Sequence, residues 1–277
     1  MQALREPIIS HKTRQFEPVS MPFLSQLIMI TGRNLRVFLR TPAAIIPALL
    51  ISGFFLIIYE ASLGSASSFL PGLAGKSYIG FILPVSVVSS ALSGAGIAGQ
   101  AIVRDIENGY FDKLLLTPVS RPALLFGVIV ASAVILVLQT SLVVVIGLLM
   151  GLEPATGLAG IVFVLALALM IGIGFAGFTV GIALMSGNAA ATQGASFLFF
   201  PLTFLTSTFV PLALLNGWIK AVATVNPITY ILDAMRSVLL NGWEVDTMLK
   251  GLLACAILGG IMFVFSLWAL RFRTTRK

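Results

Sequence analysis

The residue types that most often carry out chemistry are scarce in this chain and do not form a reactive set. His11 is the one histidine, and no nucleophile, base and orienting group can be assembled around it. Cys255 is the one cysteine and lies inside an apolar run, which excludes an internal disulfide and a cysteine-based zinc cluster and favours simple packing. We therefore expect no catalytic residue, no metal ligand and no cofactor in this chain itself.

Glycine spacing at one place imitates a nucleotide-binding loop. Gly172, Gly174 and Gly177 have the Gly-x-Gly-x-x-Gly spacing, but they lie in an apolar run of helical length with no strand before them. Gly177 with Gly181 has the Gly-x-x-x-Gly spacing through which membrane helices approach closely, so helix packing is the better interpretation. No Gly-x-x-x-x-Gly-Lys-Ser/Thr phosphate loop occurs, and the chain has no recognisable means of hydrolysing ATP by itself.

Segment 103–121 combines charged and apolar side chains as protein interfaces do. Its charges have both signs and its apolar residues include two aromatic rings. The charged members are Asp105, Glu107 and Asp112 with Arg104 and Lys113, and the apolar members are Tyr110, Phe111, Leu114 and Leu115. The segment is therefore a candidate docking site for a protein partner, and a solvated loop is the alternative.

The composition around these features is that of a membrane protein. The chain is 58% hydrophobic and 10% charged with a mean hydropathy of +1.05, whereas a soluble domain is roughly half apolar and a quarter charged. A helix needs about 20 mostly apolar residues to cross a bilayer. The apolar runs predict one all-α membrane domain over 42–277, with spanning helices at 43–60, 78–101, 122–150, 156–184, 195–215 and 247–270.

Two further helices are expected that do not cross. Residues 21–41 predict an amphipathic interfacial helix, with an apolar face in the acyl boundary and Arg33, Arg36 and Arg40 at the phosphates. This helix is either an anchor or also a lever that transmits motion. The apolar patch 227–240 would rise only about 21 Å as a helix, so we expect a short re-entrant helix between spans five and six, within an extracellular segment 211–245.

The basic residues predict the orientation, because lysine and arginine favour the cytoplasmic side. With six crossings both termini share a side, and the tail 1–20 has no apolar core of a secretory signal. The net charge of +7 matches the anionic cytoplasmic leaflet, so membrane lipids and not nucleic acid are the expected partners. The thirteen basic residues on that side are Arg5, Lys12, Arg14, Arg33, Arg36, Arg40, Arg104, Lys113, Arg121, Arg271, Arg273, Arg276 and Lys277, against Lys76, Lys220, Arg236 and Lys250 on the other.

Small polar residues form stripes on two of the predicted spans. Such stripes either line a substrate path or pack against another helix, and the residues themselves leave both readings open. The candidates for a substrate path are Ser86, Ser90, Ser93, Thr203, Thr206 and Ser207.

The outer segment offers a capped helix with a charge pair. Asn226 can cap a helix that begins at Pro227, and Asp233 and Arg236 then lie one turn apart and can neutralise each other. The element is either an extracellular gate or a structural plug with an internal ion pair.

Two motifs give the chain a resemblance to the ABC-2 family of exporter permeases, including the daunorubicin-resistance type. The family's cytoplasmic link carries an acidic-glycine-acidic pattern followed by Leu-Leu, Thr-Pro and Ser-Arg, and Ile106 departs from it where members often have arginine. The matching residues are Glu107, Gly109, Asp112, Leu114, Leu115, Thr117, Pro118, Ser120 and Arg121, then Asn226, Pro227, Tyr230, Asp233 and Arg236 before the last span. Arg33, Asn34, Leu35, Arg40 and Pro42 are also similar, so the resemblance covers essentially the whole chain.

The resemblance implies that 103–121 is a coupling helix that docks in a groove of a separate nucleotide-binding subunit, which would bind ATP and Mg. It also implies export of a hydrophobic or amphiphilic substrate, such as a drug, lipid or glycolipid, across a bacterial or archaeal plasma membrane. The transporter would contain a second copy of this chain or a related permease. The alternative is an ATP-independent carrier or channel, although a proton-coupled carrier usually needs an acid or base near the centre of a span, and none lies there.

Overall fold

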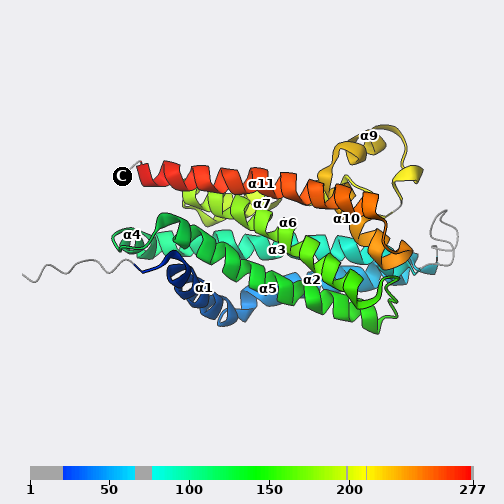
Figure 1. The fold of residues 1–277 in the computed structure, drawn as a ribbon, viewed down its shortest axis with the longest axis horizontal. Coiled ribbons are helices and arrows are strands. Elements are labelled where there is room, and N and C mark those ends of the chain that lie inside the picture. Colours follow the sequence, from blue (N-terminus) through cyan, green and yellow to red (C-terminus); the bar gives the residue numbers. More distant parts are fainter. Residues whose placement is uncertain (1–20, 66–76, 198, 210, 276–277) are drawn as a thin grey trace, which may run out of the picture.

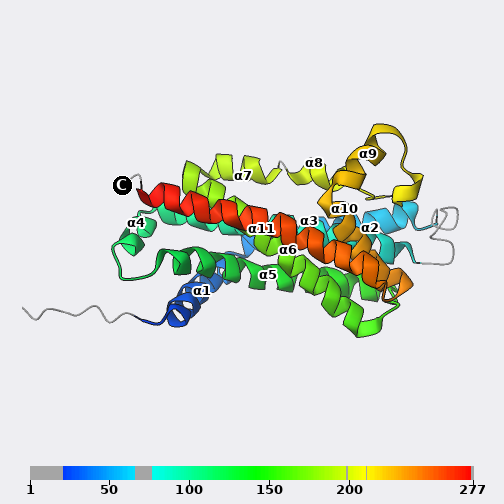
Figure 2. The same ribbon diagram turned by 45° about the horizontal axis from the view of Figure 1, so that its top comes forward.

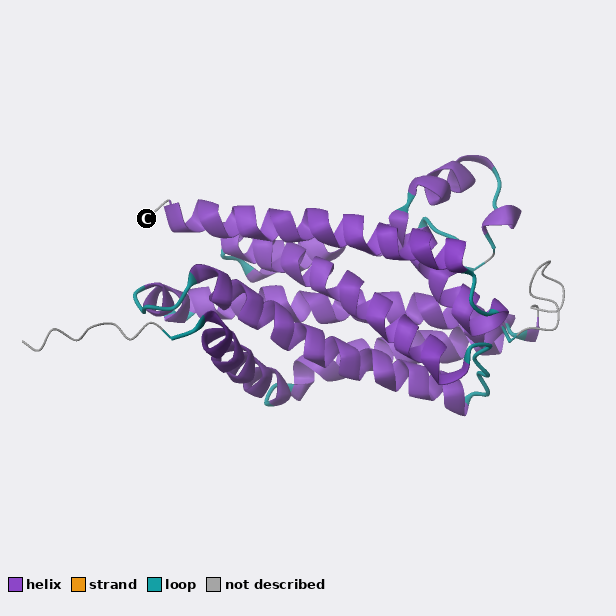
Figure 3. Ribbon diagram, viewed as in Figure 1, coloured by secondary structure: helices purple, strands orange, loops and turns teal. Residues whose placement is uncertain are grey.

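The computed structural model describes residues 21–65, 77–197, 199–209 and 211–275. Every regular element in these ranges is a helix (Figure 3), which confirms the predicted all-α class for them. The predicted cytoplasmic tail, 1–20, lies outside the described residues.

Four long helices form the body of the bundle. Each is long and apolar enough to cross a membrane, by length and composition. They correspond to the predicted spans two, three, four and six, and α6 packs against each of the other three. Their bounds are α3 Tyr78–Glu107, α5 Arg121–Leu149, α6 Gly157–Ser186 and α11 Val245–Thr275.

The two remaining predicted spans differ from these four. α2 (Pro42–Leu63) has 22 residues, begins at a proline and lies against α3. Its apolar stretch among the residues described in full is Leu49–Leu63. The predicted span 195–215 is not one helix, because α7 (Ala189–Phe197) and α8 (Phe199–Phe204) are followed by bends at 205–209.

Several other helices lie at the two ends of the long axis, whereas α7 and α8 run along its middle (Figures 1 and 2). α1 (Phe23–Leu39), α4 (Tyr110–Leu115) and the C-terminal end of α11 share one end. The other end carries η2 (Leu212–Leu214), α9 (Gly217–Val225), α10 (Pro227–Arg236) and a single π-turn, η3 (Ser237–Asn241).

Helix α1 is amphipathic, but it turns polar side chains toward the protein. Gln26, Asn34 and Phe38 are buried, whereas Leu24 and Ile28 are more than 60% exposed. The exposed side of the helix therefore carries apolar residues, and its inner face makes specific polar contacts that the prediction did not include.

Helices α6 and α11 approach each other through glycine. A Cβ added to Gly174 would lie 2.7 Å from the Cα of Gly259, and one on Gly181 would meet the ring of Phe265. This close approach confirms the interpretation of the Gly-x-x-x-Gly spacing as a packing motif.

Replacing Gly174 with alanine should destabilise the bundle, because the backbone of Gly259 cannot move aside as a flexible side chain would. We expect a loss of about 1–3 kcal/mol in the free energy of unfolding. Unfolding can be followed through Cys255, the one cysteine, which is buried and reacts with a maleimide fluorophore only when the core opens.

Gly260→Ala is the matched control, since a Cβ there meets nothing within 4 Å. Equal unfolding temperatures for the two variants would contradict the close-packing interpretation.

Candidate functional site

The predicted coupling segment forms a compact turn at one end of the bundle. α3 ends at Glu107, and Gly109 has a φ of 65°, a left-handed conformation that favours glycine and turns the chain into α4. Phe111 is 2% exposed and anchors α4 in the bundle. Arg273, near the end of α11, lies 5.7 Å from the Phe111 ring and donates to the Leu184 carbonyl of α6 at 2.9 Å.

An arginine of α1 holds the beginning of this segment. The two terminal nitrogens of Arg33 donate to the two carboxylate oxygens of Asp105 at 2.5 and 2.7 Å. The same guanidinium lies 4.1 Å from the centre of the Tyr110 ring. Hydrogen bonding to Asp105 raises the pKa of Arg33 above its usual value, so the arginine remains charged at any physiological pH. Arg33 thus has a protein partner, whereas Arg36 and Arg40 are exposed.

A second contact from α1 holds the end of the segment. The side-chain oxygen of Gln26 accepts a hydrogen bond from the backbone N–H of Ser120 at 2.8 Å, one residue before α5 begins. Between these two contacts α1 packs closely on α5, where a Cβ on Gly127 would overlap Ile30. Helix α1 therefore bridges both ends of segment 103–121.

The contacts divide the predicted docking residues into two groups. Asp105 and Phe111 are engaged by the bundle, and Leu114 and Leu115 are partly buried. The exposed group carries two acids and an apolar tip, because Leu116 is 89% exposed. Its members are Glu107, Tyr110, Asp112, Lys113, Leu116, Thr117, Pro118 and Arg121.

At the opposite end, Arg236 of α10 joins three parts of the fold. Its guanidinium is buried and donates to the Phe81 carbonyl of α3 at 2.9 Å, to the Ser207 hydroxyl at 2.9 Å and to the Thr208 carbonyl at 3.1 Å. It also lies 3.6 Å from the centre of the Phe81 ring. The predicted pair with Asp233 is present, but its 3.4 Å distance makes it the longest of these contacts.

Asn226 joins α8 to α10. Its amide nitrogen donates to the carbonyls of Leu202 and Leu205 at 2.8 and 3.0 Å, and its oxygen accepts from the N–H of Ile228 at 3.0 Å. One side chain therefore satisfies backbone carbonyls at the end of α8 and a backbone N–H at the start of α10. Pro227 occupies the first position of α10, as predicted. Tyr230, also in the predicted gate, donates to the Thr224 carbonyl at 2.7 Å.

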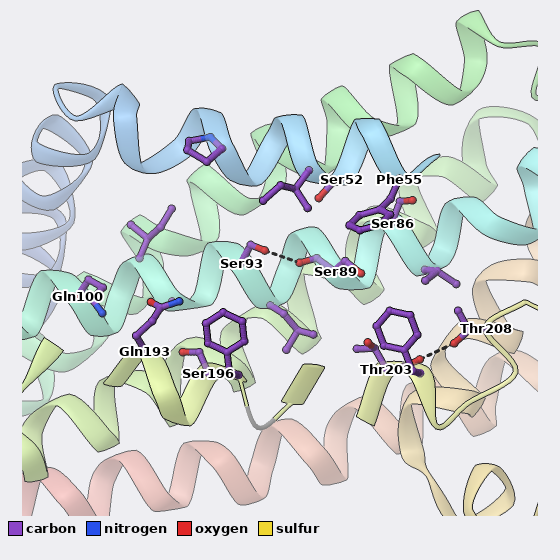
Figure 4. A pocket seen from close by; sticks show the side chains of 18 of the residues that line it. Ser52, Phe55, Ser86, Ser89, Ser93, Gln100, Gln193, Ser196, Thr203 and Thr208 are labelled. Atoms are coloured by element: carbon purple, nitrogen blue, oxygen red, sulfur yellow. Dashed lines mark hydrogen bonds between the residues drawn. The ribbon is translucent and has the colours of Figure 1, made fainter. Parts of the chain in front are cut away.

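A cavity of about 450 Å³ lies between α2, α3 and the α7–α8 pair. Figure 4 shows Ser52 and Phe55 on the α2 side and Gln193, Ser196 and Thr203 on the α7–α8 side, with α3 between them. The walls are mostly apolar, and hydroxyl and amide groups are spaced along them. Its polar lining residues are Ser52, Ser86, Ser89, Ser93, Gln100, Arg104, Gln193, Ser196, Thr203 and Thr208, together with the phenol of Tyr59.

Three of the six predicted path residues line this cavity, namely Ser86, Ser93 and Thr203. The other three contact protein instead. Ser90 is fully buried one turn before Gly94, where a Cβ would lie 2.9 Å from the side-chain oxygen of Gln139 on α5. The Thr206 hydroxyl forms hydrogen bonds with the Thr203 carbonyl and the Thr208 hydroxyl. The Ser207 hydroxyl donates to Asp233 and accepts from Arg236. The two stripes therefore serve both packing and the cavity.

A family model described as "ABC-2 type transporter" matches residues 25–240. The chain belongs to this family. The match runs from α1 to the π-turn after α10, so it includes segment 103–121, the cavity and Arg236. Together with the four long apolar helices, it identifies an ABC-2 membrane protein.

Named relatives agree with this assignment. The ABC-2 chain is 25% identical to the daunorubicin resistance ABC transporter permease protein DrrB1 of Streptomyces coeruleorubidus, over 84% of this chain and 81% of that one. It is 23% identical to the probable doxorubicin resistance ABC transporter permease protein DrrC of Mycobacterium tuberculosis, over 79% of each. It is also 25% identical to the putative transport permease ycf38 of Cyanophora paradoxa, over 77% of this chain and 74% of that one.

Several functional candidates in this ABC-2 protein were not predicted from the sequence. Gln26 looks like an ordinary polar position of an interfacial helix, and only the fold places it against Ser120. Leu116 follows two other leucines, so its exposure depends on where α4 ends. Arg104 was assigned to the docking surface but lines the cavity, and a count of residues per helical turn from Ser93 could have placed it there.

The Arg33–Asp105 pair should be energetically coupled. We expect Arg33→Met and Asp105→Asn each to lower the free energy of unfolding by about 1–2 kcal/mol, and the double substitution to cost little more than the larger single one. The loss can be measured for all three variants by heating the protein and following the labelling of Cys255 with the maleimide fluorophore. Additive losses would show that the two side chains stabilise the fold independently.

The contacts of Arg236 require the shape of a guanidinium and not only its charge. Arg236→Lys should lower the free energy of unfolding by about 2–3 kcal/mol, because one ammonium cannot reach the separated acceptors on Phe81, Ser207 and Thr208 together. Arg271→Lys, at an exposed position of α11, is the control and should be neutral. A neutral Arg236→Lys would mean that charge alone suffices.

Proposed function

We propose that this chain is the membrane-spanning subunit of an ATP-driven exporter for a hydrophobic or amphiphilic substrate, such as a drug, lipid or glycolipid. The observation that carries the proposal is the attachment of segment 103–121, whose exposed acids and Leu116 face outward while Arg33 and Gln26 of α1 hold its two ends. A docking element attached in this way transmits force to the bundle. The family match and the names of the relatives support the same conclusion.

The chain crosses the membrane six times in this proposal. α2 makes the first crossing and the α7–α8 pair makes the fifth, beside the four long helices. The end with α1, α4 and the C-terminus of α11 is cytoplasmic, because Arg36, Arg40, Lys113, Arg121 and Arg271 lie there. α10 and its π-turn are then the re-entrant element at the outer face.

Helix α3 connects the proposed docking site to the other functional features. Its inner end carries Asp105, its middle lines the cavity from Val85 to Arg104, and its outer end offers the Phe81 carbonyl to Arg236. A shift of α3 driven from the cytoplasmic end therefore changes the cavity wall and the support of α10 together. This linkage is the basis for alternating access, with α10 and Arg236 closing the outer side in the inward-open state.

The energy source is a separate nucleotide-binding subunit, which binds ATP and Mg in a site that this chain does not supply. The exposed group on segment 103–121 is the contact surface for that subunit. A second copy of this chain, or a related permease, completes the transporter.

Reversing the two exposed acids tests the docking surface. In the complex purified with its ATPase and reconstituted in liposomes, Glu107→Lys with Asp112→Lys should abolish ATP-dependent transport of a fluorescent lipid or drug. The reason is that two lysines would place positive charge against an ATPase surface that is complementary to the two acids. Binding of the ATPase, measured by copurification, should fall at least tenfold.

Glu153→Lys is the matched control, because it reverses an exposed acid at the opposite end and should leave transport unchanged. Normal transport by the Glu107 and Asp112 variant would refute the docking surface. Transport by this chain without any ATPase would favour the ATP-independent carrier.

A further inference from the structure

The cavity is long and narrow, and its two ends differ in chemistry. Its lining on α3 runs from Val85 to Arg104, which is 19 residue steps or about 28 Å of helix, close to the thickness of the hydrocarbon core. The outer and middle parts are walled by Phe55, Phe204 and Leu92 with scattered hydroxyls. Charge occurs only at the cytoplasmic end, where Arg104 is the one ionised side chain among the described lining residues.

The charge of Arg104 is not neutralised within the described chain. The three ion pairs described there join Arg33 to Asp105, Arg236 to Asp233 and Lys250 to Asp246, and no hydrogen bond of the Arg104 guanidinium is present among the same residues. Asp105 is the nearest acid in the sequence, but both of its oxygens accept from Arg33. Glu107, one turn further along α3, is exposed and is in none of these ion pairs. Arg104 therefore presents a positive charge without an ion-pair partner among the described residues, at one end of a mostly apolar cavity.

Two amides lie at the same end. Gln100 donates its side-chain N–H to the Ala189 carbonyl at 3.1 Å, which fixes the orientation of this amide at the cavity wall. Gln193 extends from α7 on the opposite wall, and Figure 4 shows Gln100 and Gln193 near each other at this end. This end of the cavity therefore combines a guanidinium with two amide side chains, and a guanidinium is a typical partner of a carboxylate, phosphate or sulfonate.

We propose that this cavity binds an anionic amphiphile, with its acidic head group at Arg104 and its apolar part between α2 and α8. The proposal rests on the proposed export function in treating this ligand as the transported substrate. A cationic amphiphile would meet the like charge of Arg104, and a neutral one would leave that charge unmatched. The anionic class therefore follows from the lining itself.

The polarity of the cavity also fits the way in which such a ligand would arrive. With the Arg104 end cytoplasmic, an amphiphile in the inner leaflet already has its head group at that level and its chain toward the membrane centre. It can move sideways into the cavity without turning over. An anionic lipid and a soluble anionic amphiphile share this chemistry.

The test compares a charged probe with its neutral counterpart. We would measure binding of 11-(dansylamino)undecanoic acid and of its methyl ester by dansyl fluorescence, with the purified protein in phosphatidylcholine nanodiscs and empty nanodiscs as the blank. Arg104→Met should weaken binding of the acid at least tenfold and leave binding of the ester within twofold. Arg104→Lys should restore part of the affinity for the acid.

Two controls fix the place of binding. Arg271→Met removes an exposed arginine from the same end of the molecule and should change neither probe. Ser93→Phe fills the middle of the cavity and should weaken both probes. The proposal would be overturned if the wild-type protein and Arg104→Met bound the acid equally well while Ser93→Phe weakened the binding of both probes.

The same assay separates the two sources of ligand. If the ligand is a lipid, phosphatidylglycerol added to the nanodiscs should compete with the acid for the wild-type protein. If the ligand is a soluble amphiphile, phosphatidylglycerol should not compete. Both results support an anionic site that depends on Arg104. The assay needs neither ATP nor an ATPase. If binding depends on Arg104 but no ATP-driven transport is found, the export function is rejected and the anionic site stands. If ATP-driven transport is found but the acid is not preferred, the anionic site is rejected and the export function stands.

Discussion

A helix can end inside an apolar environment only where another part of the protein satisfies its backbone hydrogen bonds, because lipid offers none. The end of this fold that carries α10 depends on two side chains that meet this requirement. Asn226 accepts one N–H and donates to two carbonyls, which allows α8 to end and α10 to begin beside each other. Arg236 donates a hydrogen bond to the Thr208 carbonyl in the bent stretch that follows α8. Without such side chains, the break at 205–209 would leave buried carbonyls without partners.

The break has a functional consequence, because it brings side chains of α8 and the bends to the cavity. Thr203, Phe204 and Thr208 all line it. A continuous fifth helix would present one regular stripe, whereas the bent stretch presents a hydroxyl at the outer end and leaves Ser207 free to contact Arg236. The support of α10 and the shape of the cavity are therefore two results of the same local geometry, and a change in one changes the other.

The sequence predicted those features that depend on neighbours in the chain. The four long helices, the capped start of α10 and the packing contact at Gly181 follow from hydropathy, capping and spacing, and the structure confirms them for the described residues. The broken fifth span was not predicted, because its end depends on Asn226, 21 residues beyond Leu205. The inward polar face of α1 was missed for the same reason, since the partners of Gln26 and Arg33 lie 94 and 72 residues away.

The arginines predicted to lie on the cytoplasmic side show how one compositional signal contains several physical roles. Counted together they indicate orientation, but in the fold they separate. Arg36 and Arg40 are exposed, and Arg33 forms an ion pair that joins α1 to α3. Arg104, next in the chain to the acid that Arg33 engages, is left to face the cavity. The Arg33–Asp105 pair thus has an effect beyond stability, because by engaging the nearest acid it leaves the positive charge of Arg104 available to a ligand.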